Sequence, residues 1–323
     1  MNGLRGYVLR RLGAGVLLLA LASLLTFALL RVVPGDPTIT KLGGARNIDP
    51  AALAELRHEL GLDRSVVAQY LSWVGGLLQG DLGQSYFSQY AVTTLIGQRV
   101  VPTLELAGLA FVVGLVLAVP AALVSATRPR SIAARLVNAA TAALMAAPPF
   151  LVGIAFVVVL SVQAGLLPAR GYVPFVEDPL ENLRLVAMPA LTLGLAVAAP
   201  LVVLLRASLG ETLRAPFIRT ATGKGLQRRR VVLGHALPNA LIPSLTYLGV
   251  TVGYLLGGVV VVEYVFGWPG LGSLVVDAVL KRDYAVLQSV VLLAVAIFVF
   301  VTFVTDLLYG VLDPRLRVGE GQP

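Results

Sequence analysis

The sequence has no cysteine and few ionisable groups for its length. Without cysteine, the 323 residues offer no disulfide, no thiolate nucleophile and no thiolate metal site. The two histidines, His58 and His235, lie far apart in the sequence and form no metal-ligand spacing. Charged residues make up 13% of the chain, about half the share of globular proteins. Neither a metal centre nor thiol chemistry is therefore expected.

Apolar residues make up 57% of the chain, more than the roughly 45–50% of a soluble domain. The chain must therefore meet lipid. The net charge of +8 raises the alternative of a nucleic-acid binder, but such proteins gather Lys and Arg on a soluble face. Here the basic residues flank apolar segments, which is typical of a membrane protein.

Apolar windows of about 20 residues, the length that crosses a bilayer as a helix, occur six times. They cover residues 13–33, 101–126, 134–166, 186–205, 240–266 and 287–308. The third is long enough to be tilted or broken. We therefore predict an all-α integral membrane protein with six transmembrane helices.

Basic residues in the connections indicate the orientation. Arg and Lys are frequent near residues 128–135 and 206–230, whereas the two shorter loops on the opposite side hold only Arg170, Arg184, Lys281 and Arg282. Both termini are thus predicted in the cytoplasm. The alternative of a cleavable signal peptide is disfavoured, because the first apolar run is too long and lacks a small-x-small cleavage site.

Residues 34–100 form the only sizeable polar stretch outside the membrane. Asp49-Pro50 is a typical helix start and Gly61 a stop, and a second helix is predicted from Ser65 to near Gly80. The predicted organisation is residues 1–33 (N-terminus and first span), 34–100 (external helical region), 101–310 (five-helix core with a cytoplasmic loop at 206–239) and 311–323 (cytoplasmic tail).

The basic stretch 206–239 reads as helix, turn, helix around Gly225. Helical spacing places Leu213, Phe217 and Ala221 on one face of the first helix. In the second helix the corresponding face holds Val232, Leu233, Ala236 and Leu237. From this pattern alone, the segment either packs against a partner or lies at the interface, where its arginines attract anionic lipid.

Two further segments are candidates for the transport route. Pro148-Pro149 interrupts the third span, either as a pore-lining kink or as simple packing. Trp268 reads as an interfacial aromatic, and the turn at Pro269 and Gly270 precedes a short helix to about Lys281. Glu263 and Asp283 would flank that helix, and either bind a peptide amine or pair with Arg282.

One string in the cytoplasmic loop resembles the EAA loop of binding-protein-dependent ABC importers, in particular their dipeptide, oligopeptide and nickel branch. It is Ile218-Arg219-Thr220-Ala221-Thr222-Gly223-Lys224-Gly225-Leu226, followed by His235-Ala236-Leu237-Pro238-Asn239. Ala221, Gly225, Leu237 and Pro238 match the motif directly, whereas Arg219 stands at its acidic position and Thr220 at its next alanine. The resemblance implies that the loop docks on an ATPase through Arg219, Thr220, Ala221, Lys224, Gly225, Leu226, Leu237 and Pro238.

Further strings of the same branch extend the resemblance over nearly the whole chain. They are Val33-Pro34-Gly35-Asp36-Pro37, the segment from Gly61 to Ser85, Glu263-Tyr264-Val265-Phe266-Gly267-Trp268-Pro269-Gly270 leading to Asp283, and the tail Asp313-Pro314-Arg315. The resemblance implies the type I importer permease fold in a bacterial inner membrane. It also implies a second permease chain, two ATP-binding subunits that use ATP and magnesium, an external solute-binding protein and a peptide cargo.

Two other functional classes were weighed. An ion-coupled secondary transporter usually has ionisable groups near the membrane midplane, but Glu105, Glu263 and Asp306 fall near the ends of the predicted spans. A membrane enzyme lacks support because no nucleophile and base pair stands out. The chain has no G-x-x-x-x-G-K-[ST] string and no cofactor is expected on it. The cargo stays open between dipeptides, oligopeptides, a nickel chelate and glutathione.

Overall fold

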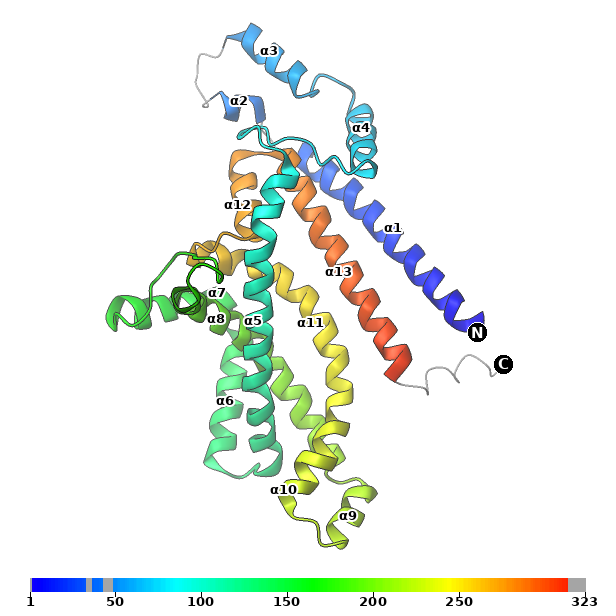
Figure 1. Ribbon diagram of the computed structural model, residues 1–323, viewed down its shortest axis with the longest axis vertical. Coiled ribbons are helices and arrows are strands. Elements are labelled where there is room, and N and C mark those ends of the chain that lie inside the picture. Colours follow the sequence, from blue (N-terminus) through cyan, green and yellow to red (C-terminus); the bar gives the residue numbers. More distant parts are fainter. Residues whose placement is uncertain (1, 33–36, 43–48, 313–323) are drawn as a thin grey trace. The chain divides into compact units, whose positions relative to one another are not determined.

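The computed structural model describes residues 2–32, 37–42 and 49–312. Within them the chain is helical and falls into two compact units (Figure 1). The first combines Met1–Thr103 with Pro269–Pro323, and the second is Leu104–Trp268. One long helix, α5 (Val92–Thr127), contributes its beginning to the first unit and the rest to the second.

The first unit pairs the first and last long helices of the chain. α1 (Asn2–Val32) lies along α13 (Tyr284–Leu312), so helices from distant parts of the sequence are neighbours (Figure 1). A Cβ atom added at Gly15 in α1 would come 2.8 Å from Val299 Cγ1 in α13. Small residues permit such close helix contact in membranes.

The core of the first unit joins the beginning of α5 to α12 (Leu271–Lys281) and α13. Its buried residues are Val92, Ile96, Leu271, Leu274, Ala278, Val286, Leu287 and Val290. The predicted short helix after Gly270 is therefore present as α12, and it is packed rather than free. Val279 of α12 is 52% exposed and lies outside this packed face.

The region predicted to be external contains α2 (Pro37–Lys41), α3 (Pro50–Glu59) and α4 (Val66–Leu78). The predicted starts of α3 and α4 are confirmed, since Asp49 accepts a hydrogen bond from the Ala51 N–H and Ser65 from the Ala68 N–H. The predicted stops are confirmed as well. Gly61 and Gly80 have φ of 63° and 80°, the left-handed conformation that ends a helix at low steric cost.

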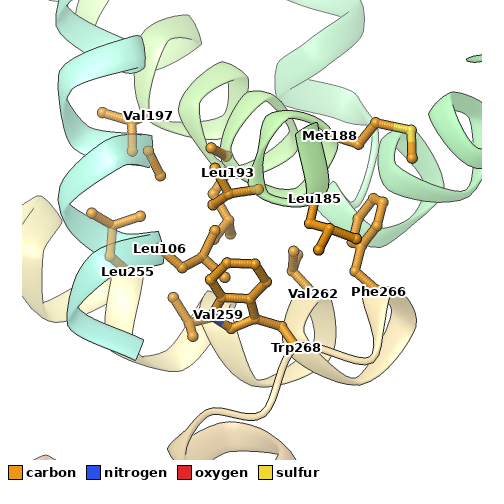
Figure 2. Packing of buried hydrophobic residues seen from close by; sticks show 13 residues of the cluster. Leu106, Leu185, Met188, Leu193, Val197, Leu255, Val259, Val262, Phe266 and Trp268 are labelled. Atoms are coloured by element: carbon orange, nitrogen blue, oxygen red, sulfur yellow. The ribbon is translucent and has the colours of Figure 1, made fainter. Parts of the chain in front are cut away.

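The second unit is organised around α8 (Pro179–Thr212), which has buried residues along most of its length. α6 (Ile132–Ala146), α7 (Pro149–Phe156) and α11 (Leu237–Phe266) pack against α8. Leu106, Leu193, Val259 and Trp268 are among the buried residues of its main core (Figure 2). Because these residues come from distant segments, this core fixes α5, α8 and α11 together.

α5 and α8 approach each other at a pair of glycines. A Cβ added at Gly114 would lie 2.7 Å from Val197 Cγ1, and one at Gly194 would lie 2.6 Å from Val113 Cγ1. Such distances leave no room for a larger residue. Sequence analysis did not single out either position.

The third predicted span is two helices rather than one continuous helix. α6 ends at Ala146, α7 begins at Pro149, and their directions differ by 110° after η1 (Val157–Gln163) is included. The two prolines explain the break, because proline lacks an N–H and disfavours helix at the preceding residue. The predicted interruption at Pro148-Pro149 is thus confirmed.

Among the described residues, 4 helices are individually long and apolar enough to cross a membrane, and up to 6 spans result if each of two broken helix pairs counts as one. The prediction of six spans agrees with the upper figure. The strings around Pro34 and Asp313, together with Arg315 and Arg317, lie outside the described residues.

Candidate functional site

The predicted coupling loop contains a short helix, α9 (Pro216–Gly223), held on a buried base. Pro216 is the first helical residue, where its missing N–H is harmless. Ile218 and Ala221 are buried in a cluster with Leu205 and Leu209 of α8. This packing fixes one face of α9 and leaves its other face to solvent.

The predicted burial of two residues, Phe217 and Leu233, is wrong. Phe217 is 46% exposed and its neighbour Ile218 takes the buried position, while Leu233 is 41% exposed and Val231 is buried. The second half of the loop consists of α10 (Arg228–Val231), followed by η2 (Val232–Ala236) and α11. The wider helical repeat of η2 changes which side chains face inward.

The turn at Gly225 is a regular helix ending rather than a loose loop. The Gly225 N–H donates to the Thr222 carbonyl at 3.0 Å, and the Leu226 N–H donates to the Ala221 carbonyl at 3.4 Å. These two bonds, with Gly225 at φ 80°, form a Schellman motif, and Leu226 packs with the Ala221 cluster. The backbone of the turn is therefore defined.

The residues predicted to contact an ATPase differ in burial, and only some of them are exposed. Ala221 is buried and Leu226 and Leu237 are partly buried, so these three hold the loop in place. The exposed members are Arg219, Thr220, Lys224, Gly225 and Pro238. The exposed set forms the candidate contact surface, and its docking on an ATPase stays a prediction.

Arginines fix the base of the loop from two sides. Arg228 donates to the carbonyl of Thr127, the last residue of α5, at 3.0 Å. A cation at a helix C-terminus satisfies a free carbonyl and favours the helix dipole. Arg206 donates to Asn138 Oδ1 at 2.5 Å, linking α8 to α6. A displacement of α9 would thus act on α5, α6 and α8.

At the other candidate segment of the second unit, Trp268 is fully buried rather than interfacial. The Trp268 indole meets the Tyr172 ring edge-on, with 4.7 Å between ring centroids, and the backbone N–H of Trp268 donates to the Glu263 carbonyl at 2.8 Å. Gly267 has φ 62° and reverses the chain there. Trp268 is therefore a core residue that closes the end of α11 (Figure 2), and Glu263 is buried with it.

Sequence analysis missed a polar cluster beside this core. Asn182 donates to Glu105 Oε1 at 2.6 Å and to the Val173 carbonyl at 2.8 Å, and Tyr172 donates to Glu105 Oε2 at 3.4 Å. Partial burial, followed by the nearby Glu105 carboxylate, raises the pKa of Tyr172. α5 begins at Val92 instead of near residue 101, so Glu105 lies inside the helix rather than near its start.

In the first unit Asp283 binds the segment at Ser85 and Tyr86 to the corner between α12 and α13. Its carboxylate accepts from the Ser85 hydroxyl at 2.5 Å, from the Tyr86 N–H at 3.2 Å and from the Val286 N–H at 3.4 Å. Burial, opposed by Arg31 and reinforced by Asp283, raises the pKa of Tyr86 to about 12. The described residues show no ion pair between Asp283 and Arg282.

Gly270 is buried, whereas Pro269 and Pro149 are half-buried and Pro148 is exposed. Leu271, which follows Gly270, donates its N–H to Thr103 Oγ1 at 2.7 Å and so anchors the start of α12. The gate role of Pro148, Pro149, Glu263, Trp268, Pro269, Gly270 and Asp283 stays a prediction.

Comparison with known proteins decides the family. Residues 114–318 match the family described as binding-protein-dependent transport system inner membrane component, and residues 4–107 match the N-terminal component of such systems. The chain belongs to this family. The resemblance found in the loop around Gly225 is thereby confirmed, and the chain is a multi-pass inner-membrane transport component.

Curated relatives and a solved structure agree. The di/tripeptide transport system permease protein DppB of Pseudomonas aeruginosa is 36% identical, covering 96% of this chain and 98% of that protein. The glutathione transport system permease protein GsiC of Pectobacterium atrosepticum is also 36% identical, with the same coverage. A chain of the MetNI methionine ABC transporter, 19% identical, has a TM-score of 0.55 over 68% of this chain and 96% of that chain. The predicted permease fold is confirmed.

Proposed function

We propose that this chain is a permease subunit of an ATP-driven importer of short peptides. It forms the translocation pathway with a second permease chain, takes energy from two ATP-binding subunits that use ATP and magnesium, and receives its cargo from an external solute-binding protein. The permease relatives carry di/tripeptide, dipeptide and glutathione in their names, which favours short peptides over a nickel chelate as cargo.

The observation that carries the proposal is the construction of the α9 surface. Arg219, Thr220 and Lys224 are exposed, while Ile218 and Ala221 beneath them are packed on α8. A surface anchored in this way can pass a push from an ATPase to the membrane helices. In a merely lipid-bound helix, the apolar face that holds Ile218 and Ala221 would instead lie in the bilayer. The sequence contains no G-x-x-x-x-G-K-[ST] string, which supports the proposal that another chain hydrolyses ATP.

The orientation is part of the proposal. The segment 206–239 and both termini face the cytoplasm, where ATP is available, and residues 34–100 face outward, where a binding protein would arrive. Glu105 lies inside α5, so its position in the sequence no longer argues against an ion-coupled transporter. Family membership and the α9 surface favour the ATP-driven class.

Co-purification tests the proposal. The tagged chain is isolated from its native membrane, and attached chains and bound solute are identified by mass spectrometry. We expect a second permease, ATP-binding subunits and a short peptide or glutathione. Isolation of the chain without ATP-binding subunits, combined with uptake driven by a proton or sodium gradient, would establish a secondary transporter instead.

A further inference from the structure

The first unit contains a cavity of about 200 Å³ that sequence analysis did not anticipate. It lies between the C-terminal end of α1, helix α4, the segment 82–86 and the start of α13. A water molecule occupies roughly 30 Å³ of liquid, so the space suits several waters or a small organic group. None of the residues that line it is acidic.

Arg31 supplies a fixed guanidinium to this cavity. It donates to Gln69 Oε1 at 2.6 Å and to the Phe27 carbonyl at 3.2 Å, and it stacks 3.4 Å above the Phe27 ring. Gln69 is held in turn by donating to the carbonyls of Leu62 and Arg64. A guanidinium has five N–H groups, so donors remain for a ligand.

Two more donors in the cavity lining have no partner in the structure. Nε1 of Trp73 and Nε2 of Gln288 are both buried without a hydrogen bond, and the Gln288 side chain is 4% exposed. Buried polar groups are nearly always paired, and an unpaired donor costs about 1–3 kcal/mol. Trp73 Nε1, Gln288 Nε2 and the Arg31 guanidinium line the same cavity. A ligand with hydrogen-bond acceptor atoms would satisfy the two unpaired donors.

Part of the cavity wall is apolar and aromatic. Phe27 and Trp73 stack with 6.1 Å between ring centroids, and Leu82 and Ala285 also line the space. Arg64 adds a second, exposed guanidinium to the lining. Donors of this kind beside aromatic walls suit an anion with an apolar body, and a carboxylate fits better than a large hydrated phosphate.

We propose that this cavity binds the free carboxylate of a short peptide. Arg31, Trp73 Nε1 and Gln288 Nε2 donate to the two carboxylate oxygens, and the last side chain of the peptide lies against Phe27 and Trp73. The choice of a peptide as source of the carboxylate rests on the proposed function. An anionic lipid headgroup is the competing source of an anion.

Trp73 provides the readout, since the chain has only 2 tryptophans. The purified full chain, in nanodiscs of phosphatidylcholine, is titrated with trialanine while tryptophan emission is recorded. We expect a saturable change with trialanine and none with trialanine amide or with inorganic phosphate at the same concentrations. The change should be absent in Trp73→Phe, which assigns it to the cavity. An equal response to the amide or to phosphate would overturn the proposal.

Gln288→Met removes one orphaned donor at similar volume and should weaken the apparent affinity at least about tenfold, as should Arg31→Met. The matched controls are Gln163→Met and Arg130→Met, which change exposed residues outside the cavity and should leave affinity unchanged. Wild-type affinity in Gln288→Met, with the variant folded as judged by circular dichroism, would contradict the site.

Nanodiscs that contain phosphatidylglycerol separate the two sources of an anion. We expect the trialanine response to persist in them, whereas its loss there would assign the cavity to a lipid headgroup. The outcomes also distinguish a failure of the cavity proposal from a failure of the proposed function. A peptide importer without the Trp73 response would refute the cavity alone, and a carboxylate response in a chain that supports no peptide uptake would refute the importer alone.

Discussion

Gly225 can be required for two separate reasons: its left-handed backbone conformation, or close approach of a partner to its backbone. Its φ of 80° disfavours most L residues, yet a Cβ added there meets no atom within 4 Å. The chain itself thus requires only the left-handed conformation. Any further need for glycine must come from a partner surface that approaches the backbone closely.

Gly225→Asn tests this separation, because asparagine tolerates the left-handed conformation better than other residues. We expect the variant to insert and fold normally but to lower ATP-dependent uptake at least about tenfold, since the side chain obstructs the ATPase. Gly165→Asn is the matched control, with φ of 62° and equally open surroundings. Uptake at the wild-type level in Gly225→Asn would remove the close-approach requirement.

Asp283 holds the segment at Ser85 and Tyr86 to the start of α13 through charge-assisted hydrogen bonds. Asp283→Asn should lower the free energy of unfolding by about 1–3 kcal/mol. In a double-mutant cycle with Ser85→Ala the two losses should not add, because the residues bond directly. Thermal melts of the assembled complex measure both effects. Unchanged stability with reduced uptake per complex would favour the gate role over the structural one.

At the scale of elements, α9 offers a matched pair of neighbouring apolar residues. Ile218→Ala should loosen α9 by about 2–3 kcal/mol, since Ile218 is buried, and so speed hydrogen exchange of its amides. Phe217→Ala should leave exchange unchanged but reduce stimulated ATP hydrolysis, because Phe217 is exposed on the same short helix as Arg219 and Thr220 of the candidate contact surface. Faster exchange in Phe217→Ala alone would reverse the assignment of the two faces.

Local chemistry explains which elements were predictable. Asp49, Ser65, Gly61 and Gly80 act within a few residues of their own position, so the ends of α3 and α4 follow from the sequence. In the 8 residues of α9, helical periodicity does not predict which residues are buried, because the adjacent Phe217 and Ile218 are both apolar. The face of α9 is decided by α8, which periodicity does not describe.

Long-range contacts explain what was missed. Ser85 and Asp283 are 198 positions apart, and Asn182 and Glu105 are 77 apart, so no local pattern joins them. Trp268 was misplaced at the interface because its burial depends on Tyr172 from a distant loop. The segment around Gly225 was identified as a candidate coupling loop from a family motif rather than from packing, and its coupling role stays a prediction.

For the whole molecule, the orientation is predicted from the distribution of basic residues among the connecting segments. The native chain has no cysteine, so a thiol reagent can react in this chain only with the single cysteine that is introduced. An impermeant thiol reagent in intact cells should label a cysteine at Ala51 but not one at Gln227 or Arg130, all three being exposed positions. Labelling at Gln227 and not at Ala51 would invert the topology.

Peptide uptake by proteoliposomes tests the central claim most directly. The complete complex, with its binding protein outside and ATP trapped inside, is supplied with labelled trialanine. We predict accumulation that requires ATP and this chain and that persists when ion gradients are collapsed. Accumulation of trialanine that does not require ATP but depends on an imposed proton or sodium gradient would contradict ATP-driven import.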